Sequence, residues 1–257
     1  MVSNGFFSRV TDLFKPNFSV RAKSNFSLEQ AVNNDLAQSS LRKIKPKEVK
    51  QLNLAQSFIT SLTGIEQFSN LEVLDLGRNY IKDLSPLATL TKLKKLCLSY
   101  NPIREITPLA NLVKLEHLIL DHNKLVEITA LANLKQLNYL DLTWSRVKDV
   151  KALAQLKNLK QLKLAYNLNY NRIKNLAALT KLNKLKKLNL AKTKLENIYF
   201  LAEMKSLTEL NLNQNKIKDI TPLLALDNLK QVSLDNNPLT EFNSQLLKQL
   251  TKKQWNA

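Results

Sequence analysis

The sequence predicts an α/β solenoid, an elongated stack of similar coils in which each coil contributes one short parallel strand. Two observations carry this prediction. Hydrophobic residues recur with a period of 22 residues from Val49 onward, and within each period leucines alternate with variable residues at the spacing of a β-strand. A single coil cannot bury its own leucines, whereas a stack of nine coils buries a continuous core.

The repeated unit reads L-x-x-L-x-L-x-x-N-x-I/L, and we number its first leucine position 1. A complete copy is residues 71–81 (LEVLDLGRNYI), and nine copies begin at residues 49, 71, 93, 115, 137, 159, 185, 207 and 229. The sixth copy is four residues longer than the others, and the extra residues follow Asn167. The unit predicts parallel strands that begin near residues 51, 73, 95, 117, 139, 161, 187, 209 and 231.

Position 9 is expected to turn the chain after each strand. Its asparagine amide can hydrogen-bond to backbone groups of adjacent coils, and the substitutes Ser57, Ser145 and Thr193 retain part of that capacity. The second half of the unit carries leucines at three-residue spacing, such as Leu84 and Leu87, which favours a 3₁₀ or loop return.

The repeats and their flanks divide the chain into four segments. Residues 1–24 are an N-terminal tail, either disordered or a short amphipathic helix. Residues 25–48 are a helical N-terminal cap, because residues 27–30 (Ser-Leu-Glu-Gln) form a capping box. Residues 49–242 are the nine repeats, and residues 243–257 are a C-terminal cap, since the ends of an open stack would otherwise expose leucine.

Composition excludes several classes of function. Three glycines leave no glycine-rich phosphate loop, and the single cysteine, Cys97, excludes disulfides within the chain and cysteine-based zinc clusters. Residues 1–20 lack an apolar run of signal-peptide length, and no stretch is long enough to span a membrane. We therefore expect a soluble protein that is cytoplasmic or exported without a cleaved signal peptide.

Position 8 contains an unusual run of rings. If the register is fixed, one position of each repeat forms a column across the sheet. Exposed rings clustered on a rigid surface are typical of recognition sites, although stacked rings also stabilise a sheet without binding anything. The candidate partner-binding rings are Tyr100, His122, Trp144 and Tyr166 at position 8, joined by His117 and Tyr139 at position 3.

A lysine-rich patch is predicted beside these rings. The net charge is +18, and residues 151–206 hold 13 Lys and Arg against 2 Asp and Glu. A lysine-rich patch beside exposed rings favours a protein partner with an acidic and apolar surface. We expect the chain to be a monomer. The alternative is nucleic acid or another polyanion, bound through phosphates and base stacking. The patch consists of Lys160, Lys163, Lys186, Lys187 and Lys192 in repeats six and seven.

Neither a metal nor a catalytic site is predicted, and no cofactor is expected. His117 and His122 are about 16 Å apart along an extended chain, which is too far for two ligands of one metal. Cys97, His117 and Asp75 fall on neighbouring strands, but an open face provides neither a water-excluded pocket nor an oxyanion hole.

The returns of the repeat carry a family resemblance. Residues 85–88 (SPLA), 107–110 (TPLA) and 221–224 (TPLL) resemble the bacterial internalin repeats, and the unit is similar to that of the leucine-rich regulatory subunit of type 1 protein phosphatase. The resemblance implies a leucine-rich repeat horseshoe with nine parallel β-strands on the concave face, 3₁₀ or loop returns on the convex face and a helical N-cap. It also implies partner binding through the concave face, with no catalysis in the repeats.

Overall fold

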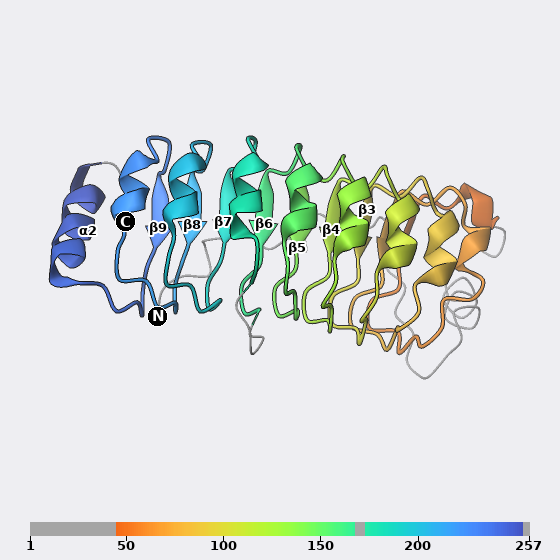
Figure 1. Ribbon diagram of the computed structural model, residues 1–257. Helices are drawn as coiled ribbons and strands as arrows, with labels where there is room; N and C mark the ends of the chain where they lie inside the picture. Colours follow the sequence, from red (N-terminus) through yellow and green to blue (C-terminus); the bar gives the residue numbers. More distant parts are fainter. Residues whose placement is uncertain (1–44, 168–172, 254–257) are drawn as a thin grey trace.

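The protein forms one open, parallel sheet of nine strands in sequential order, as the repeat predicts. The structure is a computed structural model that describes residues 45–167 and 173–253 (Figure 1). Every strand begins at the residue expected from the sequence. The strands are β1 (Gln51–Asn53), β2 (Val73–Asp75), β3 (Lys95–Cys97), β4 (His117–Ile119), β5 (Tyr139–Asp141), β6 (Gln161–Lys163), β7 (Lys187–Asn189), β8 (Glu209–Asn211) and β9 (Gln231–Ser233).

Short 3₁₀ helices return the chain from each strand to the next and line the opposite side of the stack (Figure 1). This confirms the predicted 3₁₀ returns and the horseshoe architecture. In the described residues they are η2 (Pro46–Glu48), η3 (Ile65–Gln67), η4 (Ser85–Thr89), η5 (Thr107–Asn111), η6 (Thr129–Asn133), η7 (Lys151–Gln155), η8 (Leu176–Lys181), η9 (Tyr199–Glu203) and η10 (Thr221–Ala225).

The longer sixth repeat leaves the sheet intact. Leu162 of β6 pairs with Leu188 of β7 in the same register that the other strand pairs keep. The insertion lies within residues 168–172, and the predicted N-terminal tail and residues 25–44 of the predicted cap lie within residues 1–44. Both segments lie outside the described residues, and residues 46–48 of the predicted cap form η2.

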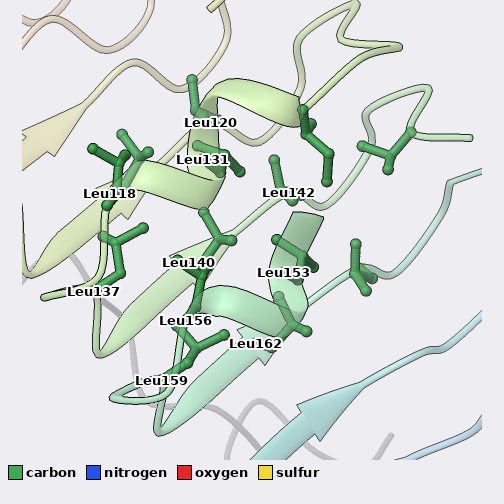
Figure 2. Packing of buried hydrophobic residues seen from close by; sticks show 14 of the residues in the cluster. Leu118, Leu120, Leu131, Leu137, Leu140, Leu142, Leu153, Leu156, Leu159 and Leu162 are labelled. Atoms are coloured by element: carbon green, nitrogen blue, oxygen red, sulfur yellow. The ribbon is translucent and has the colours of Figure 1, made fainter. Parts of the chain in front are cut away.

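The leucines of the repeat form one continuous core between the sheet and the 3₁₀ helices. Figure 2 shows Leu140 and Leu142 of one coil packing beside Leu153 and Leu156 of its return. All four are fully buried. Burial of a leucine side chain contributes about 1.5–3 kcal/mol, so the core is the largest stabilising contribution of each coil.

Asparagines at position 9 connect each coil to the one before it. The N–H of Ile81 donates to Oδ1 of Asn101 (3.0 Å), while Nδ2 of Asn101 donates to the carbonyls of Leu76 (3.0 Å) and Leu98 (3.2 Å). Because Asn101 is only 3 % exposed, these bonds satisfy buried backbone groups that water does not reach. At the substituted positions a hydroxyl donates to a carbonyl, as Ser145 does to Leu120 (3.4 Å).

The last coil is followed by helix α2 (Glu241–Lys253). Leu246 and Leu247 pack against the core, and Oδ1 of Asn243 accepts a hydrogen bond from the N–H of Ile220 (2.9 Å). These are the contacts of a cap, and residues 254–257 of the expected cap lie outside the described residues. No helix in the described part of the chain has the length and hydrophobicity needed to cross a membrane.

The buried asparagines generate a stability prediction. Asn101→Ala leaves the N–H of Ile81 without its partner, at about 1–3 kcal/mol for a buried unsatisfied group, while the carbonyl of Leu76 keeps the bond from Nδ2 of Asn79 (2.9 Å). We expect the free energy of unfolding in urea to fall by about 1–3 kcal/mol. The control Asn111→Ala, at an exposed residue of η5, should change it by less than about 0.5 kcal/mol. Equal effects of the two variants would contradict the structural role of position 9.

Candidate functional site

Position 8 of every repeat has a left-handed backbone conformation. The nine residues at this position have φ between 54° and 59°, and none of them is glycine. Such a conformation costs a non-glycine residue about 1–2 kcal/mol. The backbone still bonds between coils there, since the N–H of Tyr100 donates to the carbonyl of Asp121 (2.9 Å) and the N–H of Trp144 to that of Ala165 (3.0 Å). Position 8 lies three residues beyond the end of each strand. Its backbone is thus still bonded to the next coil, so residues at position 8 of successive coils stay one coil apart.

This conformation stacks the four rings of Tyr100, His122, Trp144 and Tyr166, which we call the aromatic column. The ring centroids of Tyr100 and His122 are 3.9 Å apart, with planes inclined by 10°. Those of His122 and Trp144 are 5.6 Å apart, and those of Trp144 and Tyr166 are 4.5 Å apart with planes inclined by 11°. The structure therefore brings together all four predicted position 8 rings as one continuous stack.

Two cations close the ends of the aromatic column. The guanidinium carbon of Arg78 lies 4.3 Å from the Tyr100 ring centroid, and Nζ of Lys192 lies 5.1 Å from that of Tyr166. Both are cation–π distances. Lys192 was predicted as part of the lysine-rich patch, but the structure places it in the stack. Arg78 belongs to the same column of the sequence, yet sequence reasoning did not select it because the sequence does not show that its side chain lies over Tyr100.

Asp121 orients the imidazole of the aromatic column. Its Oδ2 lies 2.8 Å from Nδ1 of His122, and its Oδ1 accepts a hydrogen bond from Ser99. The imidazole therefore has Nε2 as its remaining polar atom. Neither Asp121 nor Ser99 was predicted as part of the site. Their position 7, one residue before each ring, was the only signal for them in the sequence.

The two predicted rings at position 3 form a separate pair, with centroids 6.1 Å apart. Tyr139 is only 4 % exposed and packs with Cys97 and Ile119, so it offers almost no surface to a partner. Its hydroxyl donates to Oδ2 of Asp141 (3.2 Å), and burial together with this carboxylate raises the pKa of Tyr139. Its role is to pack the sheet surface.

His117 is half-buried beside Tyr139, and its Nδ1 is buried without a hydrogen-bond partner in the described residues. Burial and the charge of Lys95 lower the pKa of the imidazole, which keeps it neutral at neutral pH. His117 is therefore an uncharged, half-buried side chain on strand β4.

The lysine-rich patch is less basic than the sequence predicted. Nζ of Lys163 lies 3.2 Å from Asp141 of the preceding strand, and Nζ of Lys187 lies 2.7 Å from Glu209 of the following strand. Charge counting within repeats six and seven missed these carboxylates because they come from the adjacent coils. Lys160 and Lys186 are exposed at position 2, at the opposite end of the strands from position 8. The five lysines therefore do not form one patch.

The described residues contain no cluster of three or more metal-ligating side chains, and the Cys97 thiol is buried. Burial, reinforced by the Asp75 carboxylate, raises the pKa of this thiol, so it stays protonated at neutral pH. A protonated thiol is a poor nucleophile. The arrangement therefore does not present an activated nucleophile at Cys97.

Comparison with known proteins identifies similar repeats. Residues 47–89, 91–133 and 205–248 match the family model described as Leucine Rich repeats (2 copies). An internalin (InlF) of Listeria monocytogenes is 31 % identical, with a TM-score of 0.71 over 88 % of this chain and 72 % of that chain. Internalin C2 of the same organism is 33 % identical, with a TM-score of 0.69 over 74 % of this chain and 82 % of that chain. No curated protein sequence matches this chain.

A leucine-rich repeat protein of Leptospira interrogans has the same fold. It is 25 % identical, with a TM-score of 0.67 over 82 % of this chain and 61 % of that chain.

The stack generates a second stability prediction. Trp144→Ala removes two ring contacts, each of which is worth about 0.5–1.5 kcal/mol. We expect the free energy of unfolding to fall by about 1–3 kcal/mol, measured in urea. Gln214→Ala, at the same position and with the same backbone conformation, is the control and should change it by less than about 0.5 kcal/mol. If both variants match the wild type, the stacked rings do not contribute to stability.

Position 5 generates a prediction about pH. Oδ1 of Asp75 accepts a hydrogen bond from the N–H of Gly77 (2.9 Å), and burial raises the pKa of its carboxyl. Above this raised pKa the folded state holds a buried charge, which costs stability, and the cost disappears as the pH falls through the raised pKa towards the ordinary value of about 3.9. Asparagine makes the same bond at Asn53 and Asn189. Asp75→Asn should therefore stabilise the protein at pH 7, and the gain should shrink towards pH 4.

The control for this prediction is Asp141→Asn. Its carboxylate makes the same turn bond, to the N–H of Thr143 (3.0 Å), but it also pairs with Lys163. Removing that charge should destabilise the protein at pH 7, by about 1 kcal/mol for a partly buried pair. Thermal unfolding of both variants from pH 4 to pH 8 gives the measurement. A loss of stability in Asp75→Asn at pH 7 would contradict the desolvation argument.

Proposed function

This chain belongs to the leucine-rich repeat family and its repeats are similar to those of the internalins, and on that premise we propose that it is a non-catalytic binding module that holds a partner protein against its aromatic column. It acts as a monomer. Leucine-rich repeat proteins generally mediate protein–protein interactions, and the family suggests no reaction.

The observation that carries the proposal is the stack itself. Tyr100 and Trp144 are 42 % and 44 % exposed although their rings are held between neighbours. Large side chains that are ordered before binding lose little conformational entropy when a partner arrives. Aromatic residues on a rigid scaffold commonly contribute about 2 kcal/mol or more each to an interface.

Nucleic acid is the second candidate, and the geometry gives it less support. Base stacking needs a free ring face, but the faces within the aromatic column are occupied by neighbouring rings. Lys163 and Lys187, which would contact phosphates, are paired with carboxylates. Neutralised lysines add little to counterion release.

The experiment is affinity capture from the source organism with the wild type, Trp144→Ala and Gln214→Ala, all verified as folded by circular dichroism. A specific partner should be recovered with the wild type and Gln214→Ala and be depleted with Trp144→Ala. Measured with the purified partner, Trp144→Ala should weaken binding about 30-fold, which corresponds to about 2 kcal/mol.

Two results would count against the proposal. If a specific partner binds Trp144→Ala and the wild type with equal affinity, its contact lies elsewhere on the solenoid. If the wild type binds a generic single-stranded oligonucleotide more tightly than any protein at 150 mM salt, polyanion binding is the better function.

A further inference from the structure

The exposed part of the aromatic column consists of ring edges. Both faces of Trp144 meet neighbouring rings, and the outer face of Tyr166 meets Lys192. The exposed surface of Trp144 is therefore largely its edge. Aromatic rings carry partial negative charge on the face and partial positive charge at the edge, so a file of edges attracts electronegative groups.

The charged side chains at positions 8 and 10 are positive, like the partial charge at the ring edges. No Asp or Glu occupies position 8 or position 10 in the described repeats. At position 7, the carboxylate of Asp121 is engaged by His122 and Ser99. The described side chains at positions 8 and 10 include six cations: Arg78, Lys124, Arg146, Lys192, Lys194 and Lys216.

The dimensions of the stack limit the shape of the occupant. Arg78 and Lys192 are separated by five coil spacings of about 4.8 Å each, or about 24 Å along the solenoid axis. An extended polypeptide covers this distance in about seven residues, of which three or four face the same way. The surface is one ring wide and six residues long, so it fits an extended segment better than a compact knob.

We propose that the occupant of the aromatic column is an acidic, extended polypeptide segment of about seven residues that runs along the solenoid axis from Arg78 to Lys192. Its carboxylates meet the ring edges and the cations at positions 8 and 10. This proposal rests on the proposed function and adds the chemistry and the direction of the partner. A nucleic-acid strand would gain only its phosphate contacts here, because the rings offer its bases no free face.

The test uses a displayed library of random nine-residue peptides, selected on the wild-type chain. Enriched peptides should carry at least two Asp or Glu residues at alternating positions. Synthetic versions with Asn and Gln in place of those acids should bind at least tenfold more weakly in fluorescence anisotropy at 150 mM salt. The double variant Arg78→Gln/Lys192→Gln should also weaken the acidic peptides about tenfold.

The matched control is Lys135→Gln/Lys151→Gln, which removes two exposed charges on the side of the 3₁₀ helices and should leave affinity unchanged. Peptides that need Trp144 but bind equally well after the change to Asn and Gln would overturn the acidic partner while leaving the proposed function standing. Peptides that bind Trp144→Ala as tightly as the wild type would overturn both. Absence of enrichment, or tighter binding of a nine-nucleotide single strand than of any peptide, would overturn the extended acidic segment.

Discussion

The hydrogen-bond register between successive coils is the constraint on which the rest of the structure depends. Backbone bonds join each strand to the next, continue beyond the strand to position 8, and are completed by the asparagines at position 9. Since every coil repeats these bonds, each position of the repeat becomes a straight column. Each side chain is therefore flanked by the side chains at the same repeat position in the preceding and following coils.

The aromatic column follows from this register and does not cause it. Nine left-handed residues at about 1–2 kcal/mol each cost more than three ring contacts at about 0.5–1.5 kcal/mol each can return. The buried leucines offset the difference, because each contributes about 1.5–3 kcal/mol and every coil carries several. The sequence at position 8 is therefore free to vary, as Gln56, Gln214 and Asn236 show, and a run of rings there is not required by the fold.

The net charge of each part of the surface depends on ion pairs between adjacent coils. Lys163 and Lys187 are paired with carboxylates that lie 22 residues away in the sequence, so a count of charges within a segment overstates the local field. Arg78 and Lys192 are positioned over rings and keep their charge at the two ends of the stack. Positive charge is thus offset by carboxylates at Lys163 and Lys187 within the strands, whereas Lys160 and Lys186 are exposed at position 2, before the strands begin.

The sequence alone determined the strands, the returns, the buried leucines and the alignment of Tyr100, His122, Trp144 and Tyr166, because a strict 22-residue period fixes the register. It could not determine the burial, orientation or ion pairing of individual side chains within a column. Tyr139 and Trp144 have equivalent sequence signals, yet packing against Cys97 and Ile119 buries one while the left-handed turn exposes the edge of the other. Orientation, burial and ion pairing depend on atoms of adjacent coils, and only the tertiary structure places those atoms.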